Sequence, residues 1–493
     1  MKWMFGALLL GALLIGTSFL LTDGHDPSDG PQEARALTQE GTVLLHSYRF
    51  QDSIHPLRTA LELDPDLPEA AIGLAMAYGG LGRREEFRNT LALADSLTAA
   101  LPDKDRRMVA QLRLGLTRQS RFSSMLDSLM TRLPREQPDN IHVLRAQAEL
   151  IKLDGTFEEK LAAWRRILDQ DPNFAEAYNQ LGYLELFHGD YAKAIEYMQK
   201  YAFLAPELAN PHDSLGEVLM VQGEYEDAAR EFRAAIAKQP DLYNAYINLA
   251  KTMLYRGMIK DGLKIMDQVH EMVEGTTLGL KIDLELFHTY FQLDMHQETG
   301  QMSQTLIANY PDSDRVAVIR AIRYGYMGRL PESRALMDST LTHWRDQELY
   351  HLLPAYQRSI DNTEQSYNAL IADITGNPAT RVKRWEEALR SAELFAPVFQ
   401  LWSTRINLAR AYLDNNQPDK ARAQIEPILA VNPRLVPALT VAVRTDLALR
   451  DPKGARMALE QLQWSIRQAD EDYVGRRQAA QLEDQVLELE KHP

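Results

Sequence analysis

The 493-residue sequence contains no cysteine. This absence excludes disulfide bonds, thiolate metal sites and cysteine nucleophiles from its structure and chemistry. It also fits an oxidising compartment, where an unpaired thiol is a liability, although chance depletion gives the same composition.

Positive charge is the second thing that the sequence has little of. The chain has 54 Lys and Arg residues against 69 Asp and Glu residues, and its formal net charge at pH 7 is -15. Because such a chain repels phosphate groups, we expect no binding to nucleic acid or to an anionic membrane surface. The negative charge mildly favours a basic partner, but its simplest role is to keep a long chain soluble.

The motifs of common enzyme classes are missing as well. The sequence has no GxSxG, HExxH, Walker or GxGxxG pattern, and its 12 histidines show no metal-ligand spacing. Acidic pairs such as Glu158 and Glu159 are neighbours in sequence, so on a helix they point to different sides and form no catalytic dyad. We therefore expect a protein that is not an enzyme, with no catalytic residues, cofactor or metal site.

An apolar run extends from Trp3 to Leu21, between Lys2 and a stretch rich in aspartate. The run is long enough to span a bilayer, and the charge asymmetry favours export of the residues C-terminal to it. Residues 1–22 are predicted to be either a single-pass membrane anchor or a signal peptide, cleaved near Gly16 and Ser18. Both alternatives place the rest of the chain outside the cytoplasmic membrane, as an exported periplasmic or extracytoplasmic protein that is anchored or released.

The most informative feature is a 34-residue repeat in residues 141–276. Four windows begin at Ile141, Ala175, Ala209 and Tyr243. The eighth place is small (Ala148, Gly182, Gly216 and Ala250) and the fifteenth is glycine (Gly155, Gly189, Gly223 and Gly257). The twenty-fourth place is large (Trp164, Met198, Phe232 and Met266), and the thirty-second is proline in three windows (Pro172, Pro206 and Pro240). A fixed period of this length indicates a solenoid.

Each window predicts two short helices. The glycine ends the first helix, where the backbone needs a positive φ, and the proline stops the second. The small residue lets the two helices approach closely, and the large residue fills the groove beside that contact. One hairpin cannot bury its apolar face alone, so the hairpins must stack on one another.

These windows resemble the tetratricopeptide repeat family. The second window carries the residues on which the resemblance rests, namely Leu181, Gly182, Gly189, Tyr191, Ala194 and Pro206. The resemblance implies an all-α protein, a right-handed α-solenoid of helical hairpins that follows the N-terminal hydrophobic segment. It also implies a concave face that binds other polypeptides, and it implies no reaction.

The phase of the repeat divides the chain into segments. They are the signal peptide or anchor at 1–22, a polar tether at 23–33, partly divergent N-terminal repeats at 34–140, the regular block at 141–276, divergent repeats at 277–347, an irregular helical segment at 348–401, C-terminal repeats at 402–469 and a capping helix at 470–493. The irregular segment is predicted to be an elongated hairpin, with an inserted contact element as the less favoured alternative. Asn416 stands at a glycine place, so a left-handed backbone is predicted there.

The resemblance also implies which residues line the groove. In the family these are the second, fifth, ninth and twelfth places of each first helix, which share one helix face. They correspond to His142, Arg145, Glu149, Lys152, Glu176, Asn179, Tyr183, Leu186, Asn210, Asp213, Glu217, Met220, Asn244, Ile247, Lys251 and Leu254. Mixed charge with apolar anchors suits an extended peptide or a partner helix. Glutamate at Tyr183 and Leu186 is predicted to abolish partner capture and to leave helical content and melting temperature nearly unchanged.

Two functions fit these observations. The first is a noncatalytic interaction scaffold or adaptor of the bacterial cell envelope, which binds a protein or peptide partner in the concave groove. The second is a structural subunit of an export or polysaccharide/lipopolysaccharide assembly machine. An anchor followed by such repeats is similar to lipopolysaccharide assembly protein B, but that family ends in a cysteine-rich metal module and keeps its repeats in the cytoplasm. The sequence specifies neither the partner nor the oligomeric state.

Overall fold

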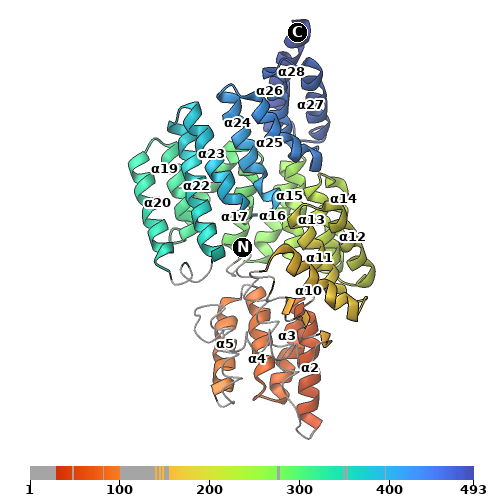
Figure 1. Cartoon of the computed structure of the whole chain (residues 1–493). Coiled ribbons are helices and arrows are strands. Elements are labelled where there is room, and N and C mark those ends of the chain that lie inside the picture. Colours follow the sequence, from red (N-terminus) through yellow and green to blue (C-terminus); the bar gives the residue numbers. More distant parts are fainter. Residues whose placement is uncertain are drawn as a thin grey trace.

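The computed structural model describes residues 29–46, 49–81, 83–99 and 139–492, except 142–143, 146, 149–150, 152–154, 275–277, 348–349, 351–353 and 395. Over this part of the chain the protein is all-helical, with 22 α-helices and no strand (Figure 1). No helix among these residues is both long and apolar enough to cross a membrane. The predicted signal peptide or anchor at 1–22 lies outside the described residues.

The N-terminal repeats begin with α2 (Asp29–His46), α3 (Phe50–Leu63), α4 (Pro68–Gly80) and α5 (Arg84–Ala99). The predicted polar tether at 23–33 is wrong at its end, because residues 29–33 already belong to α2. Pro31 does not prevent this, since a proline in the first turn of a helix lacks only an N–H group that would have no partner within the helix. The part of these repeats at 100–138 lies outside the described residues.

The regular block forms paired helices as its period predicts. Its helices are α10 (Phe157–Gln170), α11 (Ala175–His188), α12 (Tyr191–Leu204), α13 (Asn210–Val221), α14 (Tyr225–Lys238), α15 (Tyr243–Tyr255) and α16 (Ile259–Met272). Gly189, Gly223 and Gly257 have φ of 99°, 80° and 74°, which confirms the left-handed turn between the two helices of a hairpin. Gly155 is not left-handed, so that expectation is wrong for the first window.

Within each hairpin, the small residue of the first helix faces the large residue of the second. A Cβ added to Gly216 would lie 2.6 Å from the Phe232 ring, and one added to Gly182 would lie 2.7 Å from Met198 Cε. Phe232 and Met198 are themselves fully buried. The expected pairing of the eighth and twenty-fourth places is therefore confirmed in these two repeats, and it sets how closely their helices approach.

The solenoid continues to the C-terminus. Its helices are α17 (Gly279–Gln292), α18 (His296–Asn309), α19 (Asp314–Tyr326), α20 (Leu330–Arg345), α22 (Pro354–Thr375), α23 (Pro378–Glu393), the 3-10 helix η2 (Val398–Leu401), α24 (Trp402–Asp414), α25 (Pro418–Val431), α26 (Val436–Ala448), α27 (Pro452–Ser465) and α28 (Val474–Lys491). Segment 348–401 contains a long hairpin of α22 and α23, and the Asn377 side chain caps α23. Asn416 has a φ of 53°, as its place predicts.

The C-terminal repeats pack back onto the central block. Figure 1 shows α25 to α28 beside α13 to α16. A single hydrophobic cluster contains Leu254 and Met266 from the central block, Leu439 and Leu462 from the C-terminal repeats, and Val486 from α28. Hydrogen bonds between the two parts join residues 207 to 213 positions apart in sequence, and one joins Arg467 to Glu226, 241 positions away. The C-terminal repeats therefore contact repeats that lie about six repeats earlier in the chain.

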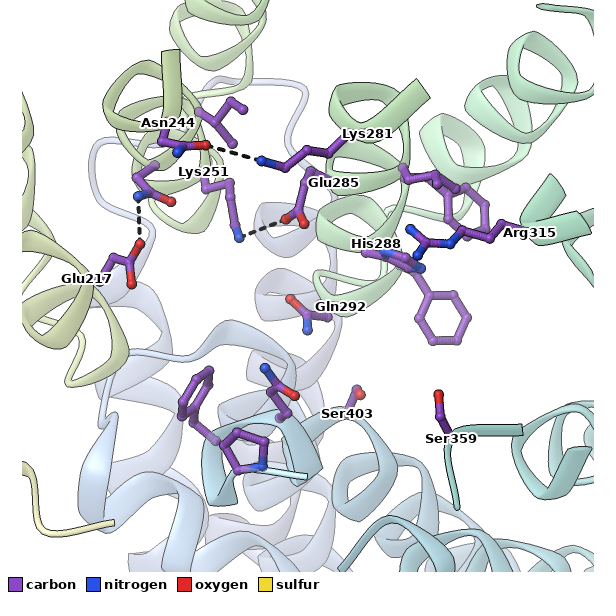
Figure 2. A pocket seen from close by; sticks show the side chains of 18 of the residues that line it. Glu217, Asn244, Lys251, Lys281, Glu285, His288, Gln292, Arg315, Ser359 and Ser403 are labelled. Carbon is purple, nitrogen blue, oxygen red and sulfur yellow. Dashed lines mark hydrogen bonds and ion pairs between the residues drawn. The ribbon is translucent and has the colours of Figure 1, made fainter. Parts of the chain in front are cut away.

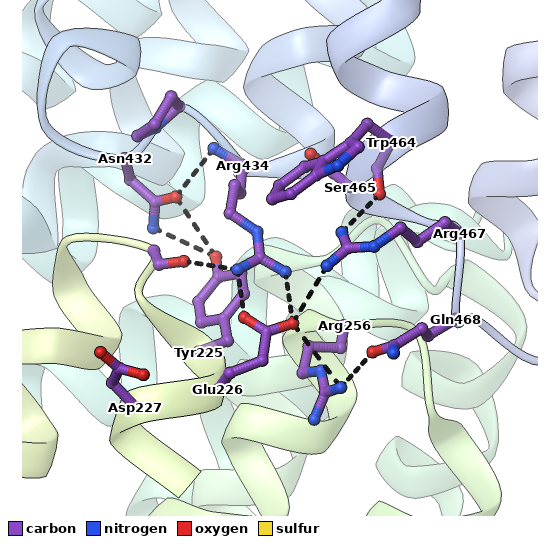
Figure 3. Close-up of polar contacts among 12 residues, drawn as sticks. Tyr225, Glu226, Asp227, Arg256, Asn432, Arg434, Trp464, Ser465, Arg467 and Gln468 are labelled. Carbon is purple, nitrogen blue, oxygen red and sulfur yellow. Dashed lines mark hydrogen bonds and ion pairs between the residues drawn. The ribbon is translucent and has the colours of Figure 1, made fainter.

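Polar contacts hold this closure together (Figure 3). We call the contact the closure interface; it comprises Tyr225, Glu226, Arg256 and Gly257 from the central block with Asn432, Arg434, Arg467 and Asp470 from the C-terminal repeats. Arg434 donates from both terminal nitrogens to the Glu226 carboxylate and also to the Gly223 carbonyl, at 3.1 Å. Asp470 donates from its backbone N–H to the Gly257 carbonyl at 3.0 Å. The turns predicted from glycine thus carry contacts between successive turns of the superhelix.

Candidate functional site

Closure of the superhelix surrounds a large cavity of about 2350 Å³. One wall consists of the first helices of successive hairpins, α11, α13, α15, α17 and α19, and the opposite wall comes from α22, η2 and the start of α24. Figure 2 shows Glu217, Lys251 and Lys281 facing this space from one side and Ser359 and Ser403 from the other. The concave face is thus one wall of a large, partly open cavity.

Most predicted groove residues line the cavity. They are Asn179, Tyr183, Leu186, Asn210, Asp213, Glu217, Met220, Asn244, Ile247 and Lys251. Three others, Arg145, Glu176 and Leu254, are not part of the lining. His142, Glu149 and Lys152 lie outside the described residues. The structure therefore brings the predicted residues of three consecutive repeats together on one wall, while their role in binding stays a prediction.

The exceptions have physical reasons. Arg145 donates two 2.7 Å hydrogen bonds to the Glu176 carboxylate of the next repeat, so these two groups satisfy each other. Leu254 is fully buried and Leu186 is 1% exposed, because the twelfth place of the first helix packs into the hydrophobic core there. The expectation that glutamate at Leu186 would leave the fold unchanged is therefore wrong.

Two carboxylates share one amide in the cavity wall. Asn248 Nδ2 donates to Asp213 Oδ1 at 3.2 Å and to Glu217 Oε1 at 3.1 Å. Asp213 is 5% exposed, and burial together with the neighbouring Glu217 carboxylate raises the pKa of Asp213 to about 8. At neutral pH the pair therefore holds a proton. Asn248 stands at the sixth place of its window, outside the four places used for prediction.

Basic groups follow the acidic pair along the same wall. Lys251 Nζ lies 3.2 Å from Glu285 Oε2, and Lys281 Nζ donates to Asn244 Oδ1 at 3.4 Å (Figure 2). Burial lowers the pKa of the Lys281 ammonium group. Lys281, His288 and Arg315 were missed because they belong to the divergent repeats, although the same places counted from Leu280 and Asp314 identify them.

Aromatic side chains connect the two walls. Ring centroids are 5.9 Å apart for Tyr183 and Phe187, 6.1 Å for Phe187 and Phe399, and 6.5 Å for Phe399 and Trp402. The first three line the cavity. Phe187 stands at the thirteenth place of its window and Phe399 lies in η2, so neither was predicted. Such rings offer large apolar contact area to a ligand at little cost in side-chain entropy.

Replacement of Asp213 by asparagine is expected to stabilise the protein at high pH. A carboxyl group whose folded-state pKa is raised to about 8 from 3.8 makes the folded state less stable as pH rises between those values. Asparagine cannot ionise, so the variant should gain on the order of 1–3 kcal/mol at pH 8 and nothing at pH 4. Thermal melts between pH 4 and 8 measure this, with Asp267→Asn on the exposed face of α16 as the control. Parallel curves for wild type and Asp213→Asn would refute it.

Family models identify the repeats directly. Three segments of the chain, at residues 163–196, 214–254 and 402–427, match models described as tetratricopeptide repeat. Comparison with curated proteins gives no match. The matched segments lie in the regular block and in the C-terminal repeats.

Three of the solved structures to which the chain is similar differ widely in how much of their length is matched. A mutant of the Thermobaculum terrenum O-GlcNAc transferase is 24% identical, with a TM-score of 0.26 over 28% of this chain and 26% of that chain, so the match spans about a quarter of the transferase. Cut9–Hcn1, described as an APC/C hetero-tetramer, is 13% identical, with a TM-score of 0.45 over 92% and 84% of the two chains. Yeast Tom70 is 14% identical, with a TM-score of 0.32 over 93% and 96%.

The matched models and the helical hairpins agree on the unit from which the chain is built. Hairpins of this kind stack into scaffolds for protein–protein interaction. The chain therefore contains tetratricopeptide repeats at residues 163–196, 214–254 and 402–427.

Proposed function

We propose that this protein is a noncatalytic scaffold that holds a polypeptide segment of a partner protein inside this cavity. The observation that carries the proposal is the convergence of the groove places of α11, α13, α15, α17 and α19 on one continuous wall. That wall offers aromatic rings, carboxylates and ammonium groups within a single space. Peptide recognition combines these elements, with apolar anchors and polar contacts that set the register.

The size of the cavity supports a polypeptide over a small molecule. Pockets for small ligands have volumes of about 300–1,000 Å³. The cavity here is about 2350 Å³ and extends across many repeats, so a small molecule would contact only a fraction of the lining. An extended chain or a helix can contact successive repeats, because each repeat presents the same places.

The proposal includes an extracytoplasmic location. It is supported by the apolar run from Trp3 to Leu21, which follows Lys2 and precedes an aspartate-rich stretch. Fractionation of bacterial cells that express the full-length chain, with N-terminal sequencing of the product, tests it. A soluble cytoplasmic product that retains residues 1–22 would refute export.

Crosslinking in intact cells tests the binding proposal. A photoreactive residue at Tyr183, which lines the cavity, is expected to trap a recurring protein partner, identified by mass spectrometry. The control is the same photoreactive residue at Phe203 on α12, which is 75% exposed and does not line the cavity. A second test uses the variant Phe187→Glu, which places a charge among the aromatic side chains that connect the two walls. This variant is expected to reduce trapping at Tyr183 at least tenfold.

The outcomes separate the alternatives. A recurring partner from Tyr183 and not from Phe203 supports the scaffold. Equal products from both positions, or none from Tyr183, would show that the cavity is not the binding site. If every product is a fixed membrane component, the protein is a structural subunit of a larger assembly.

A further inference from the structure

We propose that Asp213 and Glu217 form a socket for a basic side chain, lysine or arginine, of the bound polypeptide. This inference rests on the proposed function, because it assigns chemistry to one part of the ligand held in the cavity. We call the two carboxylates with the bridging amide of Asn248 the acidic socket.

The geometry of the acidic socket places both carboxylates in the cavity wall. Asp213 and Glu217 are one helical turn apart on α13, so they lie on the same face, and both line the cavity. A single nitrogen, Asn248 Nδ2, donates to both. Within the described part of the chain, neither carboxylate has a basic nitrogen within the 4.0 Å of an ion pair. The socket thus presents two acceptor groups whose donors, the Asn248 amide and the Tyr183 hydroxyl, are both neutral.

The polar groups on the helices around the socket have partners elsewhere. From α15, Lys251 is turned to Glu285 of α17, at 3.2 Å. From α17, Lys281 donates to Asn244. From α11, the Tyr183 hydroxyl is neutral; it donates to Ser214 at 3.2 Å and also faces Glu217. The two nearby ammonium groups therefore contact other residues; they act on Asp213 and Glu217 only through their longer-range charge, and neither forms an ion pair with these carboxylates.

A second observation points to a missing donor at the same part of the wall. Asn179, one repeat earlier at the same place as Asp213, is 3% exposed and lines the cavity. Its Nδ2 donates to Asn210 Oδ1 at 3.4 Å, but its Oδ1 accepts no hydrogen bond from the residues that the structure describes. A buried acceptor without a donor is unfavourable, so a ligand that donates here would relieve that cost. Ammonium and guanidinium groups, and the backbone next to them, are rich in such donors.

A basic ligand side chain would also resolve the protonation of the pair. Two close carboxylates, Asp213 buried and Glu217 partly buried, resist ionising together without a counter-charge, so the empty socket keeps a proton. A lysine or arginine supplies that charge, the second carboxylate ionises, and one proton is released to solvent for each ligand bound. Binding should therefore tighten as pH rises, up to tenfold per unit, and level off above about pH 8.

Peptide selection on the full-length protein tests the socket. The probe is a phage library of random dodecapeptides, selected against wild type, against Asp213→Asn/Glu217→Gln, and against the matched control Asp267→Asn/Glu271→Gln. The control pair is also spaced by four residues, on α16, but is exposed and outside the cavity. Wild type and control are expected to enrich lysine or arginine at one position, and the socket variant is expected to lose that enrichment.

The best selected peptide then gives quantitative readouts. Replacing its basic residue by glutamine is expected to weaken binding to wild type at least tenfold and to leave binding to the socket variant unchanged. Calorimetry at pH 7 in phosphate and in Tris is expected to report release of close to one proton with wild type and none with the socket variant.

The outcomes for the two proposals are distinguishable. Peptides that lose binding in Phe187→Glu but show no basic preference, or that keep that preference in the socket variant, overturn the socket and leave the scaffold standing. No peptide enriched above background by wild type overturns both.

Discussion

Arg434→Glu is expected to open the superhelix at the closure interface and to lower the melting temperature sharply. The Arg434 side chain is 8% exposed and donates twice to Glu226 and once to the Gly223 carbonyl. Its guanidinium also lies 4.9 Å from the Tyr225 ring centroid and 4.7 Å from that of Trp464. Glutamate would remove all of these contacts and place a second carboxylate against Glu226.

The magnitude follows from the burial of Arg434. Breaking a buried ion pair by removing one partner costs about 3–5 kcal/mol. The lower end applies here, because Glu226 is 37% exposed and its charge is partly screened. The Arg434 hydrogen bonds lower the pKa of Glu226 to about 2. The contribution of the pair is therefore complete above the ordinary glutamate pKa of 4.5 and is lost as pH falls towards 2.

Small-angle X-ray scattering measures the opening directly. The radius of gyration of Arg434→Glu should exceed that of wild type, because the C-terminal repeats lose their contact with the central block. Arg444→Glu on the exposed face of α26 makes the same chemical change outside the closure interface. It should change neither the radius of gyration nor the melting temperature. Equal scattering curves for Arg434→Glu and Arg444→Glu would show that apolar contacts alone hold the C-terminal repeats against the central block. A double-mutant cycle of Arg434→Ala and Glu226→Ala isolates the pair.

Leu186→Glu is expected to unfold its repeat, whereas Phe187→Glu next to it should leave the fold intact. Leu186 is 1% exposed and packs in a cluster with Tyr191, Met198 and Val218. Glutamate there loses apolar burial worth about 2–5 kcal/mol and leaves a buried carboxylate without a partner. Phe187 is only half-buried and faces the cavity, so its replacement should cost about 1 kcal/mol in ring contacts.

Circular dichroism at 222 nm during thermal unfolding distinguishes the two variants. Leu186→Glu should show a melting temperature lower by at least 5 °C, from a loss on the order of 4 kcal/mol or more. Phe187→Glu should melt within about 2 °C of wild type and yet lose the crosslinked partner. A wild-type melt for Leu186→Glu would place Leu186 in the groove, as the repeat pattern alone suggested.

The comparison of these neighbours shows how far the repeat pattern can predict a site. Tyr183, Asp213, Lys251 and similar places were found from the period, because the same places of each first helix share one face. The pattern failed at Leu254, which does not line the cavity; Leu186 does line it but is 1% exposed, because the twelfth place there packs against the second helix of the hairpin. It also could not find Phe399, because η2 does not follow the repeat period and lies next to the cavity only because the superhelix closes.

The sequence by itself determined the helical hairpins, their left-handed turns at Gly189, Gly223, Gly257 and Asn416, and the paired small and large residues inside them. These features depend on contacts within one repeat or between neighbours, which a 34-residue period records. Only the tertiary structure decided that the superhelix closes after about six repeats, that Arg434 meets Glu226, and that the concave face becomes a cavity. The reason is that closure depends on small rotations added up over many repeats, and no single window contains that sum.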